Sequence, residues 1–172
     1  NRGKLQIVAP SRWIANEAMK SSLFNEFNIN VIPYGIDTNI FKPEDNGIKS
    51  AIGLRSTDRV ILFVADATLN PRKGFSFLQT VIGELKNKHV YVVSVGDQTP
   101  IIKNYQNHIH LGVISNDKRL SSIYSMADIF IIPSQQDNLP NTVLESLSCG
   151  TPVIGFNTGG VPEMVIPEYT GK

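Results

Sequence analysis

The strongest constraint on the fold of this chain is a repeated order of apolar run, polar loop and helical pattern. The apolar runs are short, rich in β-branched residues and bounded by polar residues, glycine or proline; they cover residues 59–65, 89–96, 110–115, 129–132 and 152–154. Such runs are typical of strands buried on both faces. Between two of them, Leu78, Val81, Ile82 and Leu85 follow the spacing of one helix face. Strands that alternate with helices predict an α/β fold with a doubly wound parallel sheet.

A separate strand and helix precede this repeat. Residues 5–11 read as a short strand, and Ser11 can cap a helix that runs to about Phe27. Residues 30–43 hold two prolines, a glycine and no helical period, which predicts a linker. Further helices are expected at residues 48–54 and 119–127, the latter capped by Asn116 or Asp117.

Composition excludes several classes of protein. The chain has 172 residues, 41% of them hydrophobic, and a formal net charge of +1, so no basic excess indicates a nucleic-acid partner. No apolar run is long enough to cross a bilayer. The single cysteine, Cys149, fits a reducing compartment and a packed thiol. His108 and His110 share one side of a strand, but no nearby residue completes a metal set. We therefore expect a cytoplasmic protein without a metal.

Two carboxylates flank the start of a helix that follows the strand at residues 129–132. Asp137 lies in the loop before this helix, Pro140 can begin it, and Glu145 lies about one turn inside it. Parallel strands place ligands at their carboxyl ends, where a helix N-terminus attracts phosphate. The carboxylates would then bind hydroxyl groups, as a diphosphate with a sugar on each side would offer. A capping role for Asp137 and a solvated Glu145 fit the local sequence equally well.

Two cations occupy the corresponding place after the strand at residues 59–65. Arg72 and Lys73 come just before Gly74 and the next helix, at the same edge of the predicted sheet. Cations beside a helix N-terminus attract phosphate. An exposed basic loop without function explains the same two residues.

Several segments resemble the motifs of one enzyme family. They are Asp137 to Glu145 with seven residues between the acids, Cys149-Gly150-Thr151-Pro152-Val153, Gly159-Gly160-Val161-Pro162-Glu163, and the linker run Ile32-Pro33-Tyr34-Gly35-Ile36-Asp37 with Phe41-Lys42-Pro43. Together they are similar to the signature of the retaining, nucleotide-sugar-dependent glycosyltransferases with the GT-B fold, group 1 or family 4. Three positions depart from that pattern: Asp137 stands for the usual Glu, Tyr34 for the usual Asn, and Thr68 for the family arginine.

This resemblance implies a division of the chain into two parts. Residues 44–172 would be the C-terminal, nucleotide-sugar-binding domain, with a Rossmann-like sheet that forms one half of a GT-B fold. This domain would be truncated at its C-terminal end. Residues 1–43 would be the last strand and helix of the N-terminal half, together with the interdomain linker.

The resemblance also implies which residues bind the donor, a nucleoside-diphosphate sugar. Lys73, Asp137 and Glu145 would be the catalytic residues: Lys73 would hold the diphosphate, Asp137 hydroxyls of the transferred sugar, and Glu145 the ribose hydroxyls. Arg72 would assist Lys73. The base would lie against the backbone of Gly112, Val113 and Ile114, and the backbone around Asn138, Leu139, Pro140 and Asn141 would stabilise the leaving diphosphate. No metal or cofactor is expected, because the sequence has no Asp-x-Asp pair to clamp one.

The implied reaction is transfer of a sugar to an acceptor with retention of configuration, in bacterial surface polysaccharide synthesis. The acceptor site would belong to an N-terminal half outside this chain, which would also make any peripheral contact with the inner face of the membrane. The chain alone would then bind nucleotide without transferring sugar. A nucleotide-sugar 2-epimerase and a non-catalytic nucleotide-binding module are the alternatives.

Overall fold

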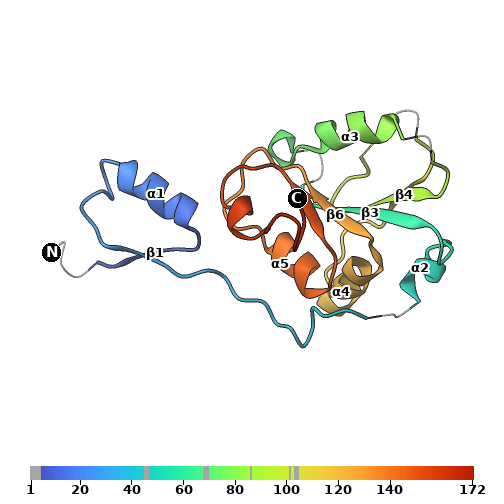
Figure 1. The fold of residues 1–172 in the computed structure, drawn as a ribbon, viewed down its shortest axis with the longest axis horizontal. Helices are drawn as coiled ribbons and strands as arrows, with labels where there is room; N and C mark the ends of the chain where they lie inside the picture. Colours follow the sequence, from blue (N-terminus) through green and yellow to red (C-terminus); the bar gives the residue numbers. More distant parts are fainter. Residues whose placement is uncertain (1–4, 45–46, 68–69, 86, 101, 103–104) are drawn as a thin grey trace.

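The computed structural model describes residues 5–44, 47–67, 70–85, 87–100, 102 and 105–172. A small N-terminal unit holds two parallel strands, β1 (Ile7–Ala9) and β2 (Ile29–Val31), joined by helix α1 (Arg12–Lys20). An extended segment leads from it to a larger unit built on a five-stranded sheet (Figure 1).

The larger unit is a parallel sheet with the strand order β5-β4-β3-β6-β7. Its strands are β3 (Arg59–Val64), β4 (Val90–Val95), β5 (His108–His110), β6 (Ile129–Ile132) and β7 (Val153–Gly155). Its helices are α2 (Ile48–Ala51), α3 (Phe75–Gly83), α4 (Asp117–Met126) and α5 (Asn141–Ser148), with single 3₁₀ turns η2 (Pro71–Lys73) and η3 (Val161–Glu163). The chain adds β4 and β5 on one side of β3, then β6 and β7 on the other. The boundary between β3 and β6 is therefore the topological switch point.

Helices cover both faces of this sheet, with α3 on one side and α4 and α5 on the other (Figure 1). Alternate residues of β3 divide accordingly: Leu62 packs in the cluster that holds residues of α4 and α5, and Phe63 in the cluster of α3. Strands buried on both faces explain the continuous apolar runs in the sequence. The predicted doubly wound parallel sheet is confirmed.

Several element boundaries differ from the sequence prediction, and three of the differences have a clear local cause. Helix α1 ends at Lys20 rather than near Phe27, because Ser21 adopts an extended backbone and turns follow it. Residues 30 and 31, expected in the linker, belong to β2, which is too short to give a periodic signal. Strand β5 covers His108–His110 instead of residues 110–115, because Gly112 takes a φ of +69°, outside strand geometry.

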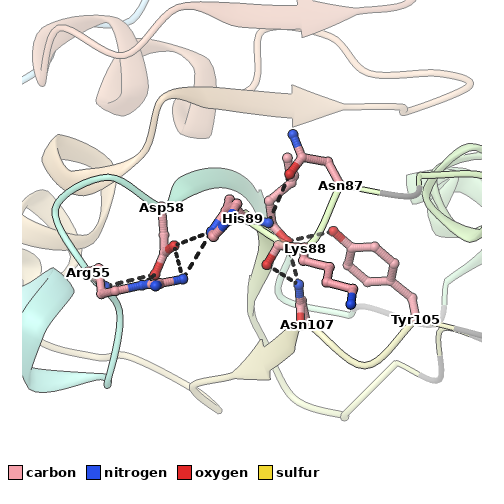
Figure 2. A network of polar contacts seen from close by, with 8 residues as sticks. Arg55, Asp58, Asn87, Lys88, His89, Tyr105 and Asn107 are labelled. Atoms are coloured by element: carbon pink, nitrogen blue, oxygen red, sulfur yellow. Dashed lines mark hydrogen bonds and ion pairs between the residues drawn. The ribbon is translucent and has the colours of Figure 1, made fainter.

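Charged side chains and a histidine surround the amino ends of the strands, and we call Arg55, Asp58, Arg59, His89 and Asp128 the amino-end cluster. Asp58 accepts hydrogen bonds from the Arg55 backbone N (2.8 Å) and Nη2 (3.1 Å) and lies 3.4 Å from His89 Nδ1 (Figure 2). Asp128 accepts from Arg59 Nη1 and, at 2.8 Å, from the N of Val60. These contacts fix the loops that enter β3, β4 and β6.

Candidate functional site

The loops that follow β3 and β6 meet at the switch point of the sheet. Lys73, in the loop after β3, places its Nζ 3.1 Å from Oδ2 of Asp137, in the loop after β6. The two side chains are only 21% and 15% exposed, so this ion pair is largely withdrawn from water. The structure thus joins two residues that are 64 positions apart and that the sequence placed separately at this edge.

Backbone contacts hold these two loops against each other. Gln135 donates from its backbone N to the carbonyl of Arg72 (2.9 Å) and from Nε2 to the carbonyl of Pro71 (3.1 Å). Gly74 has a φ of +71°, and a Cβ there would lie 1.8 Å from the carbonyl oxygen of Pro133. Only glycine permits this approach, so the position of Lys73 relative to Asp137 is set by the backbone.

The Gly159-Gly160 turn packs directly on the Asp137 loop. The N of Gly160 donates to the carbonyl of Asp137 at 3.0 Å. A Cβ at Gly159 would lie 1.9 Å from the Asp137 carbonyl oxygen, and one at Gly160 would lie 1.7 Å from that of Asn138. Two consecutive glycines therefore let the backbone of this turn pack directly against the loop before α5.

The N-terminus of α5 has no side-chain cap. Pro140 occupies the N-cap position rather than the first helical one, with its ψ of 122° outside the helix, and α5 begins at the exposed Asn141. Leu139, just before it, is buried. Asp137 accepts instead from Lys73 and from the N of Asn138 (3.1 Å), so it does not cap the helix. The positive end of the α5 dipole thus remains available to an anion.

Glu145 is half-buried in α5 and is not a solvated residue. Its Oε2 accepts a hydrogen bond of 2.9 Å from the hydroxyl of Tyr124, in α4. Burial raises the pKa of Glu145, the hydrogen bond from Tyr124 lowers it, and the charge of Asp117 raises it further. No hydrogen bond or ion pair in the described part of the chain joins Glu145 to Lys73 or Asp137, so the predicted residues form two separate groups.

The remaining predicted residues lie around this centre. The side chain of Arg72 is exposed and makes no ion pair with a residue that the structure describes. Gly112, Val113 and Ile114 follow β5; the carbonyl of Gly112 accepts from the N of Gly96 at 3.0 Å, and Val113 is 70% exposed. Thr68, at the position of the family arginine, lies outside the described residues.

The structure adds contacts that the sequence did not indicate. Asn138 Oδ1 accepts a hydrogen bond of 2.5 Å from the hydroxyl of Ser11, the N-cap of α1. The carboxylate of Glu163 accepts from the backbone N of Arg12 (2.8 Å) and of Trp13 (2.7 Å). A cavity of about 520 Å³ opens beside these contacts, lined by Arg12, Val31, Pro33 and Glu163. The start of α1 therefore belongs to the surroundings of the site.

The histidines and the cysteine have local partners. His108 Nε2 and His110 Nδ1 lie 2.8 and 2.9 Å from the hydroxyl of the buried Ser94. Burial lowers the pKa of His108, and His110 lowers it further. Cys149 is buried, with its Sγ 3.4 Å from the hydroxyl of Ser121. Among the described residues, no group of three or more His, Cys, Asp or Glu side chains could hold a metal, and no helix is long and apolar enough to span a membrane.

Comparison with known proteins gives consistent matches. A model of the family described as "Glycosyl transferases group 1" matches residues 45–172. The D-inositol 3-phosphate glycosyltransferase of Segniliparus rotundus is 27% identical over 191 residues, which cover 98% of this chain and 42% of the relative. HepE of Anabaena, solved with UDP and glucose, superposes with a TM-score of 0.75 at 20% identity, over 96% of this chain and 48% of that one. WaaG, a glycosyltransferase involved in lipopolysaccharide biosynthesis, superposes with a TM-score of 0.80 at 16% identity, over 96% of this chain and 48% of that one. The chain thus spans less than half the length of these proteins.

Proposed function

The chain belongs to the group 1 glycosyltransferases, and from this we propose that it binds the nucleoside-diphosphate sugar of a retaining enzyme with the GT-B fold. In this proposal residues 44–172 are the donor-binding domain. Residues 1–43 are the last strand and helix of the N-terminal half, followed by the interdomain linker. A second domain, which would carry the acceptor, accounts for the greater length of the relatives.

The observation that carries the proposal is the group at the switch point. The cation of Lys73 lies at the carboxyl end of β3, and the N-terminus of α5, which no side chain caps, lies at the carboxyl end of the adjacent parallel strand β6. Both attract a diphosphate, and neither needs a metal to do so. As the bond to the sugar breaks, negative charge grows on the leaving diphosphate, and preorganised donors at this place stabilise it.

The two carboxylates bind the two sugars on either side of the diphosphate. Asp137, held by Lys73 and by the N of Asn138, accepts hydroxyls of the transferred sugar. Glu145, on the side facing α4, accepts the ribose hydroxyls, a task that suits a carboxylate because it has only acceptor sites. The loop of Gly112, Val113 and Ile114 contacts the base, and Arg72 adds a second cation near the phosphates.

The reaction is front-face transfer to the acceptor, which retains the configuration of the sugar, with the leaving phosphate helping to remove the acceptor proton. We place this reaction in bacterial surface polysaccharide synthesis; WaaG, which shares the fold, is involved in lipopolysaccharide biosynthesis. Binding of UDP by HepE supports a nucleotide ligand. The enzyme would work in the cytoplasm, with any membrane contact made by the second domain.

The test is calorimetric titration of this chain with UDP, GDP and ADP without added metal. We expect one of them to bind with saturation, and Lys73→Ala to weaken that binding at least tenfold, about the effect of one charge-assisted hydrogen bond. Lys49→Ala is the matched control: Lys49 has the same 21% exposure and also pairs with an aspartate, Asp128, but at the other end of the sheet. No binding of any nucleotide, or equal effects of both variants, would contradict the proposed function.

A further inference from the structure

Tyr124 is a buried tyrosine whose hydroxyl reaches the candidate ribose site. It belongs to α4, is 0% exposed, and donates to Oε2 of Glu145 at 2.9 Å. Its ring packs edge-on against Phe130, with centroids 5.6 Å apart, in the strand that ends at the site. Within the described residues, the other carboxylate oxygen of Glu145 has no hydrogen-bond partner. The hydroxyl therefore holds one oxygen in place and leaves the other for a ligand.

A second layer of buried hydrogen bonds fixes Tyr124 itself. The hydroxyl of Thr151 donates to the carbonyl of Tyr124 at 2.6 Å, and the hydroxyl of Ser146 donates to the carbonyl of Thr151 at 2.9 Å. All three residues are at most 2% exposed. Helices α4 and α5 are thus tied together through the turn before β7, next to the helix turn that carries Glu145. Buried networks whose members are all satisfied rigidify their surroundings.

We propose that Tyr124 is a positioning residue that fixes the carboxylate of Glu145 for recognition of the ribose hydroxyls. The inference rests on the proposed function, because it assigns a purpose to Tyr124 only if Glu145 binds ribose. Tyr124 does not touch the ligand. Its hydroxyl selects one orientation of the carboxylate before the nucleotide arrives, which reduces the entropy lost on binding.

The hydroxyl also favours the charged form of Glu145. Two groups act on this carboxylate, Tyr124 and Asp117 from α4, and Glu145 in turn raises the pKa of Cys149 at the end of its own helix. Burial and Asp117 raise the pKa of Glu145, whereas the Tyr124 hydroxyl opposes them. Removing the hydroxyl should raise the pKa further. Since only the carboxylate accepts two hydroxyl donors, nucleotide affinity would then fall off at a higher pH in the variant.

The test compares Tyr124→Phe with Tyr105→Phe. Both variants remove one hydroxyl and keep the ring, and Tyr105 donates at 2.7 Å to the carbonyl of Val90 near the amino end of β4 (Figure 2). The probes are UDP and 2′,3′-dideoxy-UDP, with the guanosine and adenosine pairs run in parallel, titrated between pH 5 and pH 8. We expect Tyr124→Phe to bind the ribonucleotide about tenfold more weakly, to bind the dideoxy form as the unaltered chain does, and to lose affinity at a higher pH. Tyr105→Phe should match the unaltered chain in both respects.

The outcomes separate this inference from the proposed function. If the unaltered chain prefers the ribonucleotide and Tyr124→Phe keeps the same preference and pH profile, Tyr124 does not position Glu145. The donor site would then stand without it. If the unaltered chain binds both nucleotides equally, the ribose role of Glu145 is wrong, and the role of Tyr124 fails with it.

Discussion

The two ends of the central sheet both carry charged residues, but they use them differently. In the amino-end cluster, Asp58 accepts three hydrogen bonds from Arg55 alone, and Asp128 faces Arg59, Lys49 and the N of Val60. At the carboxyl ends, Lys73 and Asp137 form one ion pair, and no side chain caps α5. The side chain of Arg72 forms no ion pair with a described residue. Charge alone therefore does not mark a site. A binding site is marked by charged groups that the fold leaves able to take a further hydrogen-bond or ion-pair partner.

This difference has a physical cause. A carboxylate whose acceptor sites are filled by the protein stabilises the fold and gains little from a ligand. A cation or helix N-terminus that the fold leaves partly unsatisfied gains more from a ligand than from water, because burial strengthens the interaction. Removing a charge at the amino end is thus expected to change stability, and removing one at the carboxyl end to change binding. This expectation would be wrong if charge-removing variants at the amino end changed ligand binding and those at the carboxyl end changed stability instead.

The largest effect is expected for Gly160→Ala. The new Cβ would lie 1.7 Å from the carbonyl oxygen of Asn138, so the loop before α5 must move, at a cost of about 2–3 kcal/mol in the free energy of unfolding. Urea denaturation measures this loss. Gly35→Ala is the control, because a Cβ there meets nothing within 4 Å, and its effect should stay below about 0.5 kcal/mol. Equal stability of the two variants would show that the glycine turn does not support the loop.

A smaller loss of stability is expected for Asp128→Asn. Burial raises the pKa of Asp128, but the hydrogen bonds from Arg59 and from the N of Val60 outweigh it, so the pKa lies below its ordinary value of 3.8. A lowered carboxyl pKa adds stability above the ordinary value, and this stability disappears as the pH falls through the folded-state pKa. The variant should therefore lose roughly 1 kcal/mol or less at pH 7, since the pair is partly exposed, and this loss should shrink only as the pH falls below 3.8, through the folded-state pKa.

The counterpart of this variant at the other end of the sheet is Asp137→Asn. Asparagine keeps an acceptor for the N of Asn138, and only one ion pair is lost. Urea denaturation at pH 7 should show a smaller change than for Asp128→Asn, whereas titration with a nucleoside-diphosphate sugar should show the larger one. The opposite order would mean that Asp137 serves the fold.

The smallest effect is expected for Arg72→Ala. This exposed cation should add a long-range attraction for the diphosphate, worth about threefold in affinity at low salt and less at high salt. Arg59→Ala removes the same charge from the amino-end cluster and should leave affinity unchanged. Titration of both variants at two salt concentrations decides whether the place of the charge matters. If both variants lose nucleotide affinity to the same extent, the affinity depends on the net charge of the protein and not on the position of the arginine.

The sequence predicted those features that depend on local pattern. Buried strands such as β6 read as apolar runs, and the rule that ligands lie at carboxyl ends brought Lys73 and Asp137 to one edge. The sequence could not predict contacts that depend on how helices and loops pack. Tyr124 reaches Glu145 only because α4 and α5 lie side by side, and nothing near either residue signals the pair. Strand β2 is too short and too exposed to show a period.

The contact between Glu163 and the start of α1 makes two backbone amides into reporters of a distant part of the chain. Arg12 and Trp13 are separated from Glu163 by 151 and 150 positions, yet their N–H groups donate to its carboxylate. Such first-turn amides have no partner within their own helix. Their protection from hydrogen exchange must therefore come from Glu163. Their exchange rate thus measures how often the N-terminal unit separates from the larger unit.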